Sequence, residues 1–428
     1  MREKAAPCIA SSLGFVLVCH LALAFQFCLP VMAQQAGRAV TAQQSQPDFR
    51  LLSGKGLAKA SFDLVENNIL LQCRVNNSQP IWFIFDTGAS VNVINEKLAK
   101  NLGLMSRGVV NPSGGGGTVS GTFSEGATIS LPGVEAFKQR FFAIPLDALP
   151  TYFGRDVEGI IGADFIRNFV IEIDFADNTL TLHDPKTYNL SGERDTILLE
   201  NRNGTPYVKV EFSLDGQDTI TDQFELDSGS IRILQLNKPF ADRHKVLTIL
   251  PKAKAVEGVG GAGIGGKTKF VEARIHSLRL GRYTLPSPVI SVSQDAEGFG
   301  AGNEAGAIGT ELLRRFKVTL DYQSQRMKLS PNVHFDEPFE VDMSGLELMT
   351  RGNDFKVILI SSVRAGFPAA EAGLRGGDAI VAVNNRLAAR LGLDGLIKMF
   401  RQNGKEYRLT IKRGTETKSV KLRMKRVV

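Results

Sequence analysis

The sequence predicts a mostly β protein, in which two similar β lobes are followed by a smaller α+β module. Short apolar runs such as Ile69–Leu71, Ile81–Phe85 and Tyr207–Phe212 alternate with turns that contain Asn-Asn, Asp-Gly or clustered glycines. Such runs, bounded by turn residues, are typical of strands in all-β folds. The composition agrees, because 43% hydrophobic and 22% charged residues are ordinary values for a globular protein. The 428 residues are enough for as many as three domains.

An internal repeat provides the evidence for two lobes. The first copy contains the letters FIFDTGAS at Phe83–Ser90 and later GIIG at Gly159–Gly162. The second copy contains FELDSGS at Phe224–Ser230 and later GAIG at Gly306–Gly309. From the Asp to the final Gly is 76 residues in the first copy and 82 in the second. Similarity at matched spacing predicts two units of one plan, each with one Asp turn.

The pattern changes near Pro338, where a third module begins. Three of its apolar runs alternate as strands do, and two other segments predict short helices. The expected strands are Val357–Ser361, Ala379–Val383 and Tyr407–Ile411, and the expected helices are Pro368–Leu374 and Asp394–Phe400. We therefore expect an α+β domain at residues 338–428.

The first residues have the features of an export signal. Arg2 and Lys4 precede an apolar run of fifteen residues from Leu13 to Phe27, and Ala33 is a small residue suited to cleavage. We expect a signal peptide at residues 1–33, a flexible leader at 34–59, and a periplasmic or extracellular location. An uncleaved membrane anchor is the alternative, although a bilayer span needs about 20 apolar residues.

Cysteine usage and charge narrow the class of protein further. Three of the four cysteines lie in the N-terminal segment, so the expected mature chain keeps Cys73 alone and is held by packing. The net charge of +7 arises in residues 401–428, which carry ten Lys/Arg and two Glu. Because this excess is local, we expect an exposed basic strand face and no nucleic-acid partner, with a weak attraction to anionic lipid or an acidic partner as the alternative.

The two Asp turns, Asp86–Gly88 and Asp227–Gly229, provide the candidate chemistry. Two carboxyl groups that share one proton can hydrolyse a peptide bond, because one activates water while the other protonates the carbonyl oxygen. Close like charges cannot both form cheaply, so one pKa rises and the other falls. The glycines allow the chain to turn without a Cβ clash. Thr87 and Ser228 offer hydroxyl groups that are able to form hydrogen bonds across an interface between the lobes.

In these residues the chain resembles the pepsin and retropepsin families of aspartic proteases. The Asp turns match the catalytic motif of those families, and Ile160–Gly162 and Ala307–Gly309 match their second motif, which lies beside the catalytic turn. The resemblance implies a two-lobed acid-protease fold with a substrate cleft between the lobes. It implies that Asp86 and Asp227 form the catalytic pair, supported by Gly162 and Gly309.

The resemblance covers residues 60–332, with the lobes at 60–190 and 191–332. It implies polypeptide substrates and neither a cofactor nor a metal. Both turns lie in one chain, so a monomer can complete the site. Two features depart from pepsins: the stretch Gly114–Gly121 has no tyrosine where pepsins carry one in the flap over the cleft, and pepsin-type disulfides are missing.

A glycine-rich segment, Gly261–Thr268, matches the phosphate-loop pattern of nucleotide-binding proteins letter for letter. That loop requires a buried strand before it and a helix after it. Residues 271–276 instead alternate apolar with charged or polar side chains, which predicts a strand. We therefore expect a hairpin near the cleft rather than a nucleotide site.

Residues 338–428 resemble a PDZ domain, chiefly in Ala365–Leu374 and Gly376–Asn384. The resemblance implies that C-terminal or internal peptides bind as an added strand. It also implies a loop that receives a peptide carboxylate, formed by Gly345, Leu346, Glu347 and Leu348. The alternative is a PDZ-like fold that only packs on the lobes.

Two functions follow from the sequence. The first is an aspartic endopeptidase with a PDZ domain that selects or positions peptides, and with a membrane contact only through an uncleaved N-terminal segment. The second is a non-catalytic binding protein in which the lobes form an inactive peptide clamp. The missing flap tyrosine favours the second function, and the presence of both Asp turns favours the first.

Overall fold

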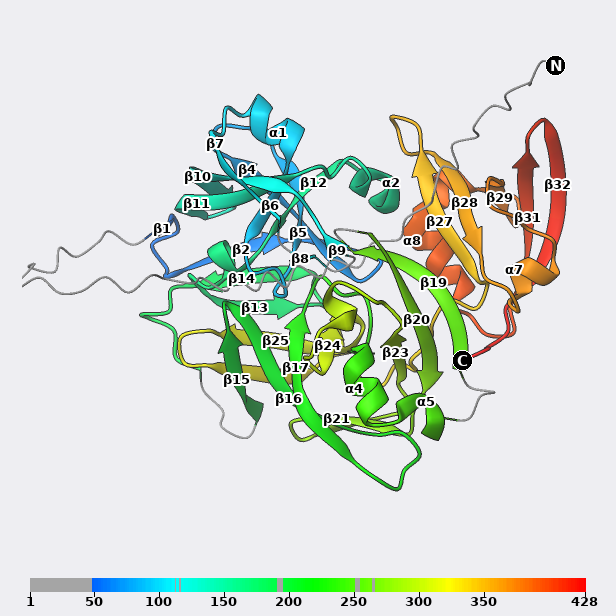
Figure 1. The fold of residues 1–428 in the computed structure, drawn as a ribbon. Coiled ribbons are helices and arrows are strands. Elements are labelled where there is room, and N and C mark those ends of the chain that lie inside the picture. Colours follow the sequence, from blue (N-terminus) through cyan, green and yellow to red (C-terminus); the bar gives the residue numbers. More distant parts are fainter. Residues whose placement is uncertain (1–47, 112, 115–116, 191–194, 251–254, 264–265) are drawn as a thin grey trace, which may run out of the picture.

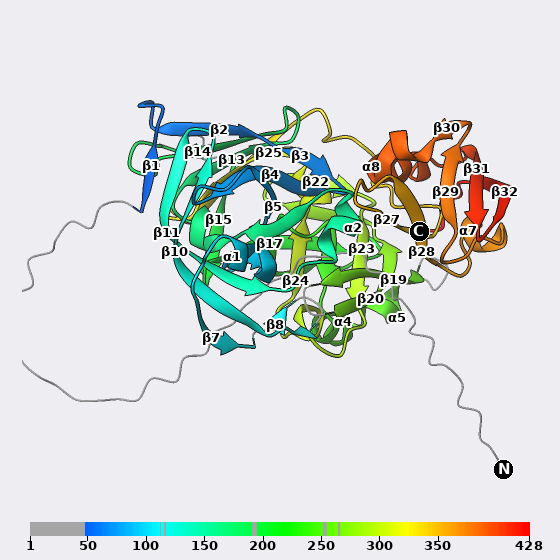
Figure 2. The same cartoon turned by 90° about the horizontal axis from the view of Figure 1, so that it is seen from above.

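The structure is a computed structural model that describes residues 48–111, 113–114, 117–190, 195–250, 255–263 and 266–428 (Figure 1). Two β lobes lie against each other with a smaller domain at their side, and the view from above in Figure 2 shows the same arrangement. The predicted signal peptide and the first part of the predicted leader lie outside the described residues. In the described part of the chain, no helix is long and apolar enough to cross a membrane.

Lobe 1 is built on a nine-stranded sheet in which an additional pairing between its two longest strands closes the sheet on itself. Its strands are β1 (Phe49–Leu51), β3 (Asp63–Val65), β4 (Asn68–Val75), β5 (Ile81–Phe85), β6 (Asn92–Asn95), β7 (Ser106–Val110), β10 (Gly121–Leu131), β11 (Val134–Ile144) and β12 (Val157–Ile161). The last three side chains of β5 are fully buried. The residue that follows them, Asp86, therefore starts its turn in the interior.

Short elements accompany this sheet. They are the helices α1 (Glu96–Asn101), α2 (Leu149–Phe153) and α3 (Ala163–Ile166) and the paired strands β8 (Ser113–Gly114) and β9 (Gly117–Thr118). Helix α1 begins where the Asn95 side chain accepts a hydrogen bond from the Lys97 amide, which is a usual N-cap contact.

Lobe 2 repeats the centre of lobe 1. In lobe 1, β12 is parallel to β5 and antiparallel to β6, and β6 is parallel to β11. In lobe 2 the same relations join β24 (Gly306–Gly309), β17 (Ile220–Asp227), β18 (Leu234–Leu236) and β23 (Val289–Ser293). The topology therefore agrees with the repeat found in the sequence.

The other described elements of lobe 2 extend this centre. They are β16 (Thr205–Ser213), β19 (Ala255–Gly263), β20 (Gly266–Arg274), β21 (Ser277–Leu280), β22 (Tyr283–Pro286), α4 (Lys238–Arg243), α5 (Val246–Ile249), the 3-10 helix Phe299–Ala301 and α6 (Thr310–Leu313). Strands β19 and β20 pair as an antiparallel hairpin. The phosphate-loop look-alike Gly261–Thr268 falls in this hairpin and is followed by strand rather than helix, as expected; residues 264–265 lie outside the described part.

The two lobes share strands of one sheet. The order is β2 (Leu57–Ser61), β14 (Thr179–His183), β13 (Val170–Asp174), β25 (Phe316–Asp321), β26 (Arg326–Pro331) and β15 (Thr196–Arg202). The central pair, β13 and β25, comes from matched positions of the repeat and runs antiparallel from Val170 opposite Asp321 to Asp174 opposite Lys317. One hydrophobic cluster includes buried side chains of both strands, so the lobes share a core.

The ordered chain starts earlier than the sequence predicted. Strands β1 and β2 lie partly or wholly within residues 34–59, the range expected to be a flexible leader. The segment Leu57–Ser61 alternates buried and exposed side chains and pairs with β14 along its whole length. Pairing with a strand more than 100 residues away gives this segment an order that its local composition does not reveal.

The C-terminal domain has its own sheet and its own core. The sheet follows the order β27 (Leu346–Arg351), β28 (Val357–Val363), β29 (Ala379–Val383), β31 (Glu406–Arg413) and β32 (Glu416–Arg423), and β30 (Arg386–Leu387) pairs with β29. Helices α7 (Pro368–Glu371) and α8 (Ala388–Phe400) complete it. The expected strands and helices of this module are all present, and the largest difference is at α8, which begins six residues before the predicted start at Asp394 and has a kink at Gly392.

Candidate active site

The two Asp turns lie at the ends of equivalent buried strands. Asp86 follows β5, and its Oδ1 accepts hydrogen bonds from the amides of Gly88 at 2.8 Å and Ala89 at 3.2 Å. These amides fix the plane of the carboxyl group, because a side chain held by two donors keeps one rotamer. The Asp86 side chain is fully buried.

Asp227 ends β17 and makes the same contacts. Its Oδ1 accepts hydrogen bonds from the amides of Gly229 at 2.8 Å and Ser230 at 3.1 Å, and its side chain is fully buried. The matching distances show that both turns have the same backbone shape.

The carboxyl group of each Asp lies directly against the glycine of the opposite turn. A Cβ added to Gly88 would stand 2.7 Å from Cγ of Asp227, and a Cβ added to Gly229 would stand 2.5 Å from Cγ of Asp86. Both are closer than Cβ atoms come in folded proteins. Glycine is therefore required at both positions for the two carboxyl groups to meet.

A reciprocal set of hydrogen bonds joins the turns. The Thr87 amide donates to Oγ of Ser228 at 3.0 Å, and the Ser228 amide donates to Oγ1 of Thr87 at 2.9 Å. Oγ1 of Thr87 donates to the Leu226 carbonyl at 2.6 Å, and Oγ of Ser228 donates to the Phe85 carbonyl at 2.9 Å. The structure thus brings together all six residues of the two predicted turns and couples the lobes at this point.

Gly162 and Gly309 lie beside the turns, as the second motif implied. A Cβ on Gly162 would stand 2.6 Å from the Ala89 carbonyl oxygen, and a Cβ on Gly309 would stand 2.5 Å from the Ser230 carbonyl oxygen. Because each glycine has no side chain, its backbone packs closely on the residue that stands three positions after the Asp, which is Ala89 in lobe 1 and Ser230 in lobe 2.

The amides of these two glycines have different partners. The Gly162 amide donates to the side-chain oxygen of Asn92 at 2.9 Å, whereas the Gly309 amide donates to the backbone carbonyl of Ile233 at 3.3 Å. Asn92 and Ile233 each lie six residues after their Asp. The sequence analysis did not select Asn92. The sign that could have identified it is that a polar residue stands in the apolar run after the first turn.

Burial raises the pKa values of both carboxyl groups, so neither falls below its ordinary value as the sequence analysis expected, and the interaction between the two groups separates them. Burial raises the pKa of Asp86 to about 6, while hydrogen bonds from Asp227 and from backbone amides oppose the rise. Burial and then the charge of Asp86 raise the pKa of Asp227 well above its ordinary value. The groups therefore ionise in separate steps, and above about pH 6 the pair carries one negative charge and one proton.

A third carboxyl group that the sequence analysis missed lies next to the pair. Glu225 is two residues before Asp227 on β17 and is fully buried. Its signal in the sequence was a charged residue between Phe224 and Leu226 in a strand expected to be buried.

The predicted carboxylate loop of the C-terminal domain lies at the start of β27. The Gly345 amide donates to Oδ2 of Asp342 at 2.6 Å, and the Leu346 amide donates to Oγ of Ser344 at 3.0 Å. Two amides of the loop are therefore already bonded within the chain. A peptide carboxylate would have to compete with Asp342 and Ser344 for them.

The edge of β27 faces lobe 1 and is in contact with helix α2. Oγ1 of Thr350 donates to the Thr151 carbonyl at 2.8 Å, and Met349 packs on the hydrophobic cluster that contains Tyr152 and Phe153. Because β27 ends the sheet, this edge is the one that an added peptide strand would use. Helix α2 covers part of it in the structure.

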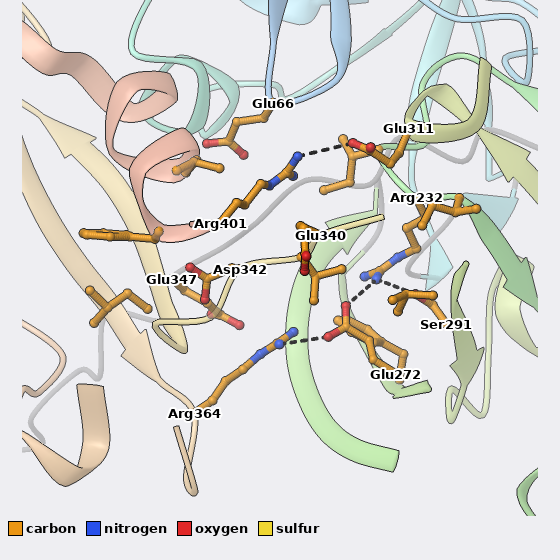
Figure 3. A pocket seen from close by; sticks show the side chains of 18 of the residues that line it. Glu66, Arg232, Glu272, Ser291, Glu311, Glu340, Asp342, Glu347, Arg364 and Arg401 are labelled. Carbon is orange, nitrogen blue, oxygen red and sulfur yellow. Dashed lines mark hydrogen bonds and ion pairs between the residues drawn. The ribbon is translucent and has the colours of Figure 1, made fainter. Parts of the chain in front are cut away.

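A cavity of about 160 Å³ separates the same end of the domain from lobe 2 (Figure 3). Leu346, Glu347 and Leu348 of the predicted loop line one side, and Phe270 and Ser291 line the other. The loop therefore faces lobe 2.

Two ion pairs cross the boundary beside this cavity. Arg364 contacts Glu272 at 3.1 Å, and Arg401 contacts Glu311 at 3.2 Å (Figure 3). Both glutamates are largely buried, at 9% and 6% side-chain exposure, so these pairs are shielded from solvent. They hold the C-terminal domain against lobe 2.

Comparison with protein families agrees with this geometry. The family model described as aspartyl protease matches residues 71–165, and the model described as PDZ domain matches residues 359–413. The chain therefore carries an aspartyl protease domain and a C-terminal PDZ domain. The first match contains the Asp86 turn and Gly162, while the Asp227 turn lies beyond it and is equivalent by its hydrogen bonds. No curated protein matches the chain.

Proposed function

We propose that the protein is an aspartic endopeptidase in which Asp86 and Asp227 act together on a water molecule. The observation that carries the proposal is the contact of two fully buried carboxyl groups, each held by two amides and each lying on the glycine of the other turn. The aspartyl protease match over residues 71–165 supports it.

The chemistry requires one base and one acid. The ionised carboxylate of the pair removes a proton from water, and the water oxygen attacks the carbonyl carbon of the peptide bond. The protonated carboxyl gives its proton to the carbonyl oxygen, which forms a tetrahedral diol. Transfer of a proton to the amide nitrogen then allows the C–N bond to break. The cross-lobe hydrogen bonds of Thr87 and Ser228 contribute by fixing the distance between acid and base.

The test is cleavage of a peptide library by the purified chain at about pH 3 to 8, a range that covers carboxyl titration. We expect Asp86→Asn and Asp227→Asn each to lower kcat/KM by at least about 100-fold, the usual contribution of a positioned acid or base. Asp177→Asn, in the exposed turn between β13 and β14, is the matched control and keeps the wild-type rate. Full cleavage by either site variant would contradict the assignment. Peptide affinity without turnover would favour the inactive clamp.

We further propose that the PDZ domain binds peptides at β27 when the domain moves away from the lobes. The contact of α2 with Thr350 and the two shielded ion pairs support a docked state that competes with peptide. Arg364→Ala together with Arg401→Ala weakens docking without stranding the glutamates, because Glu272 keeps Arg232 and Glu311 keeps Arg314.

Fluorescence anisotropy with labelled peptides tests this second proposal. We expect the double variant to bind about tenfold more tightly, which corresponds to ~1.4 kcal/mol of lost docking energy. Lys412→Ala, exposed on β31, is the control and leaves the affinity unchanged. Equal affinity of the double variant and the wild type would contradict competition. Absence of binding in both would favour a domain that only packs on the lobes.

We also propose that the chain is exported and works as a monomer. The basic start, apolar run and Ala33 at residues 1–33 support export. The completeness of the carboxyl pair within one chain supports a monomer. N-terminal sequencing of the fractionated protein and light scattering of the purified protein test these two points.

A further inference from the structure

Glu225 lies inside the candidate active site. A Cβ added to Gly88 would stand 2.8 Å from Oε1 of Glu225 and 2.8 Å from Oδ1 of Asp227, so both carboxyl groups lie against the same glycine. Residues two apart on a strand point to the same face, which explains why Glu225 and Asp227 share this direction. The side chain of Glu225 is 0% exposed.

The hydrogen bonds of Glu225 leave one oxygen unused. Tyr207, its cross-strand neighbour on β16, donates its hydroxyl to Oε2 at 3.3 Å. Oε1, the oxygen nearer Gly88, has no hydrogen-bond partner among the residues that the structure describes. A buried carboxyl oxygen without a partner is costly unless the group is neutral or serves the site.

The charged and titratable groups around Glu225 come from several elements. Asp86 and Asp227 are acids of the two turns, Tyr207 is on β16, Arg202 on β15 stacks on the Tyr207 ring, and Glu304 precedes β24. Arg202 is already paired with Glu200 at 2.8 Å. In the described part of the chain, no Lys, Arg or His forms an ion pair with Glu225.

The matched position in lobe 1 shows that this carboxyl group is not part of the common plan. Ile84 stands two residues before Asp86, where Glu225 stands before Asp227, and Ile84 is fully buried among apolar side chains. An apolar residue therefore satisfies the fold at this position. The glutamate in lobe 2 needs an explanation beyond packing.

We propose that Glu225 is a positioning residue that keeps the proton of the Asp86–Asp227 pair in place and so extends activity to higher pH. The proposal rests on the proposed protease function. It assigns to Glu225 no contact with the peptide, only an effect on its two neighbours.

The order of ionisation explains how this works. Asp86 loses its proton first, at about pH 6. Burial and then the charge on Asp86 raise the pKa of Glu225 well above its ordinary value. Burial, the charge of Asp86 and the charge of Glu225 raise the pKa of Asp227 in turn. A negative charge on Glu225 repels a second one on Asp227, so an ionised Glu225 keeps Asp227 protonated as the acid of the reaction.

The test is the pH profile of kcat/KM for Glu225→Gln, an isosteric change that keeps an acceptor for Tyr207. We expect the alkaline limb to move down by about 1 to 3 pH units, the effect of losing one nearby charge. The acid limb stays at about pH 6, because the pKa of Asp86 is raised by burial and not by a charge on Glu225. Glu225→Asp retains a carboxyl group and returns the alkaline limb toward its wild-type position. Glu371→Gln, the same change at an exposed site of the C-terminal domain, leaves both limbs in place.

A purely structural role predicts a different outcome, since Glu225→Gln would then lower kcat/KM equally at every pH. An unchanged alkaline limb in Glu225→Gln would overturn the proposal. An infrared titration of the protonated-carboxyl band keeps the proposal testable if the protein cleaves no peptide. We expect the Asp227 carboxyl to titrate at lower pH in Glu225→Gln than in the wild type, and Asp227→Asn identifies its band. Equal titration in both proteins would overturn the proposal even if cleavage confirmed the protease.

Discussion

The two Asp turns have nearly the same hydrogen bonds but different surroundings. In both turns, two backbone amides donate hydrogen bonds to Oδ1 of the Asp at 2.8 and 3.1 to 3.2 Å, and a hydroxyl group donates to a backbone carbonyl of the other lobe. The residue two positions earlier is Ile84 in lobe 1 and Glu225 in lobe 2. The common contacts place the carboxyl groups, and on our proposal the differing neighbour in lobe 2 extends the pH range over which the pair keeps its proton. Geometry and protonation can therefore be altered separately.

The largest effect is expected at the glycines that the two turns have in common. Gly88→Ala and Gly229→Ala each put a methyl group within 2.7 Å of the opposite carboxyl group, so the pair must separate. We expect kcat/KM to fall by at least about 100-fold in both, as for loss of an acid or base. Gly395→Ala in α8, where a Cβ has ordinary contacts, is the control. A large loss in only one of the two would show that the turns are not equivalent.

The hydroxyl groups that join the lobes come next. Thr87→Val leaves the Leu226 carbonyl and the Ser228 amide without partners, and Ser228→Ala does the same to the Phe85 carbonyl and the Thr87 amide. With about 1 to 3 kcal/mol for each of the two buried unpaired groups, we expect the free energy of unfolding to fall by about 2 to 6 kcal/mol in each variant.

Urea denaturation of both variants measures this change. The exposed Ser419→Ala on β32 should remain within about 0.5 kcal/mol of the wild type. Unequal losses of unfolding free energy in Thr87→Val and Ser228→Ala would show that the two hydroxyl groups do not contribute equally to the contact between the lobes.

The raised pKa of Asp86 predicts that replacing this residue by Asn stabilises the protein, by an amount that depends on pH. Its pKa is about 6 in the folded protein and 3.8 without burial, so the folded state binds more protons between these values and loses stability as pH rises through them. Asp86→Asn removes this loss. We expect the variant to equal the wild type below about pH 4 and to exceed it by about 3 kcal/mol above pH 6.

Thermal and urea unfolding from pH 3.5 to pH 7 check this prediction, at roughly the pH values that bracket carboxyl titration. Asp227→Asn provides a comparison. The pKa of Asp227 is raised further than that of Asp86, so the gain in stability of this variant should be larger and extend to higher pH. A gain that does not depend on pH would show that the burial of the charge is not its cause.

The smallest effect is expected where the two lobes support their second glycine differently. Asn92→Ala removes the side-chain acceptor of the Gly162 amide, and we expect a loss of about 1 to 3 kcal/mol. Ile233→Val at the matched position keeps the backbone carbonyl that serves Gly309 and should cost only about 0.5 to 1.5 kcal/mol, as a methylene deletion does. Equal losses measured by urea denaturation would contradict this difference.

Much of the candidate site could be predicted because it repeats. Asp86 and Asp227, with the residues of their turns and Gly162 and Gly309, were placed by matched letters at matched spacing, and the structure brings them together. Three strands of the PDZ domain, β28, β29 and β31, were predicted because each run is short, alternating and bounded by turn residues, whereas β27, β30 and β32 were not predicted.

The features that could not be predicted depend on contacts between distant segments. The closeness of Glu225 to Gly88 follows from the meeting of two lobes, and sequence shows only that a charge stands in an apolar strand. The order of residues 57–61 depends on β14. The contact of α2 with β27 joins residues about 200 positions apart, and neither segment carries a local sign of it.

The central pairing of β13 with β25 has a consequence for how the protein is made. On the ribosome, residues 170–174 emerge long before residues 316–321, so the edge of β13 must wait for its partner while most of the second lobe is still being translated. An open strand edge pairs readily with another chain. A product that terminates after residue 190 would keep this edge exposed and would be expected to associate with a second truncated copy. In the full-length chain, β25 of the same molecule pairs with this edge.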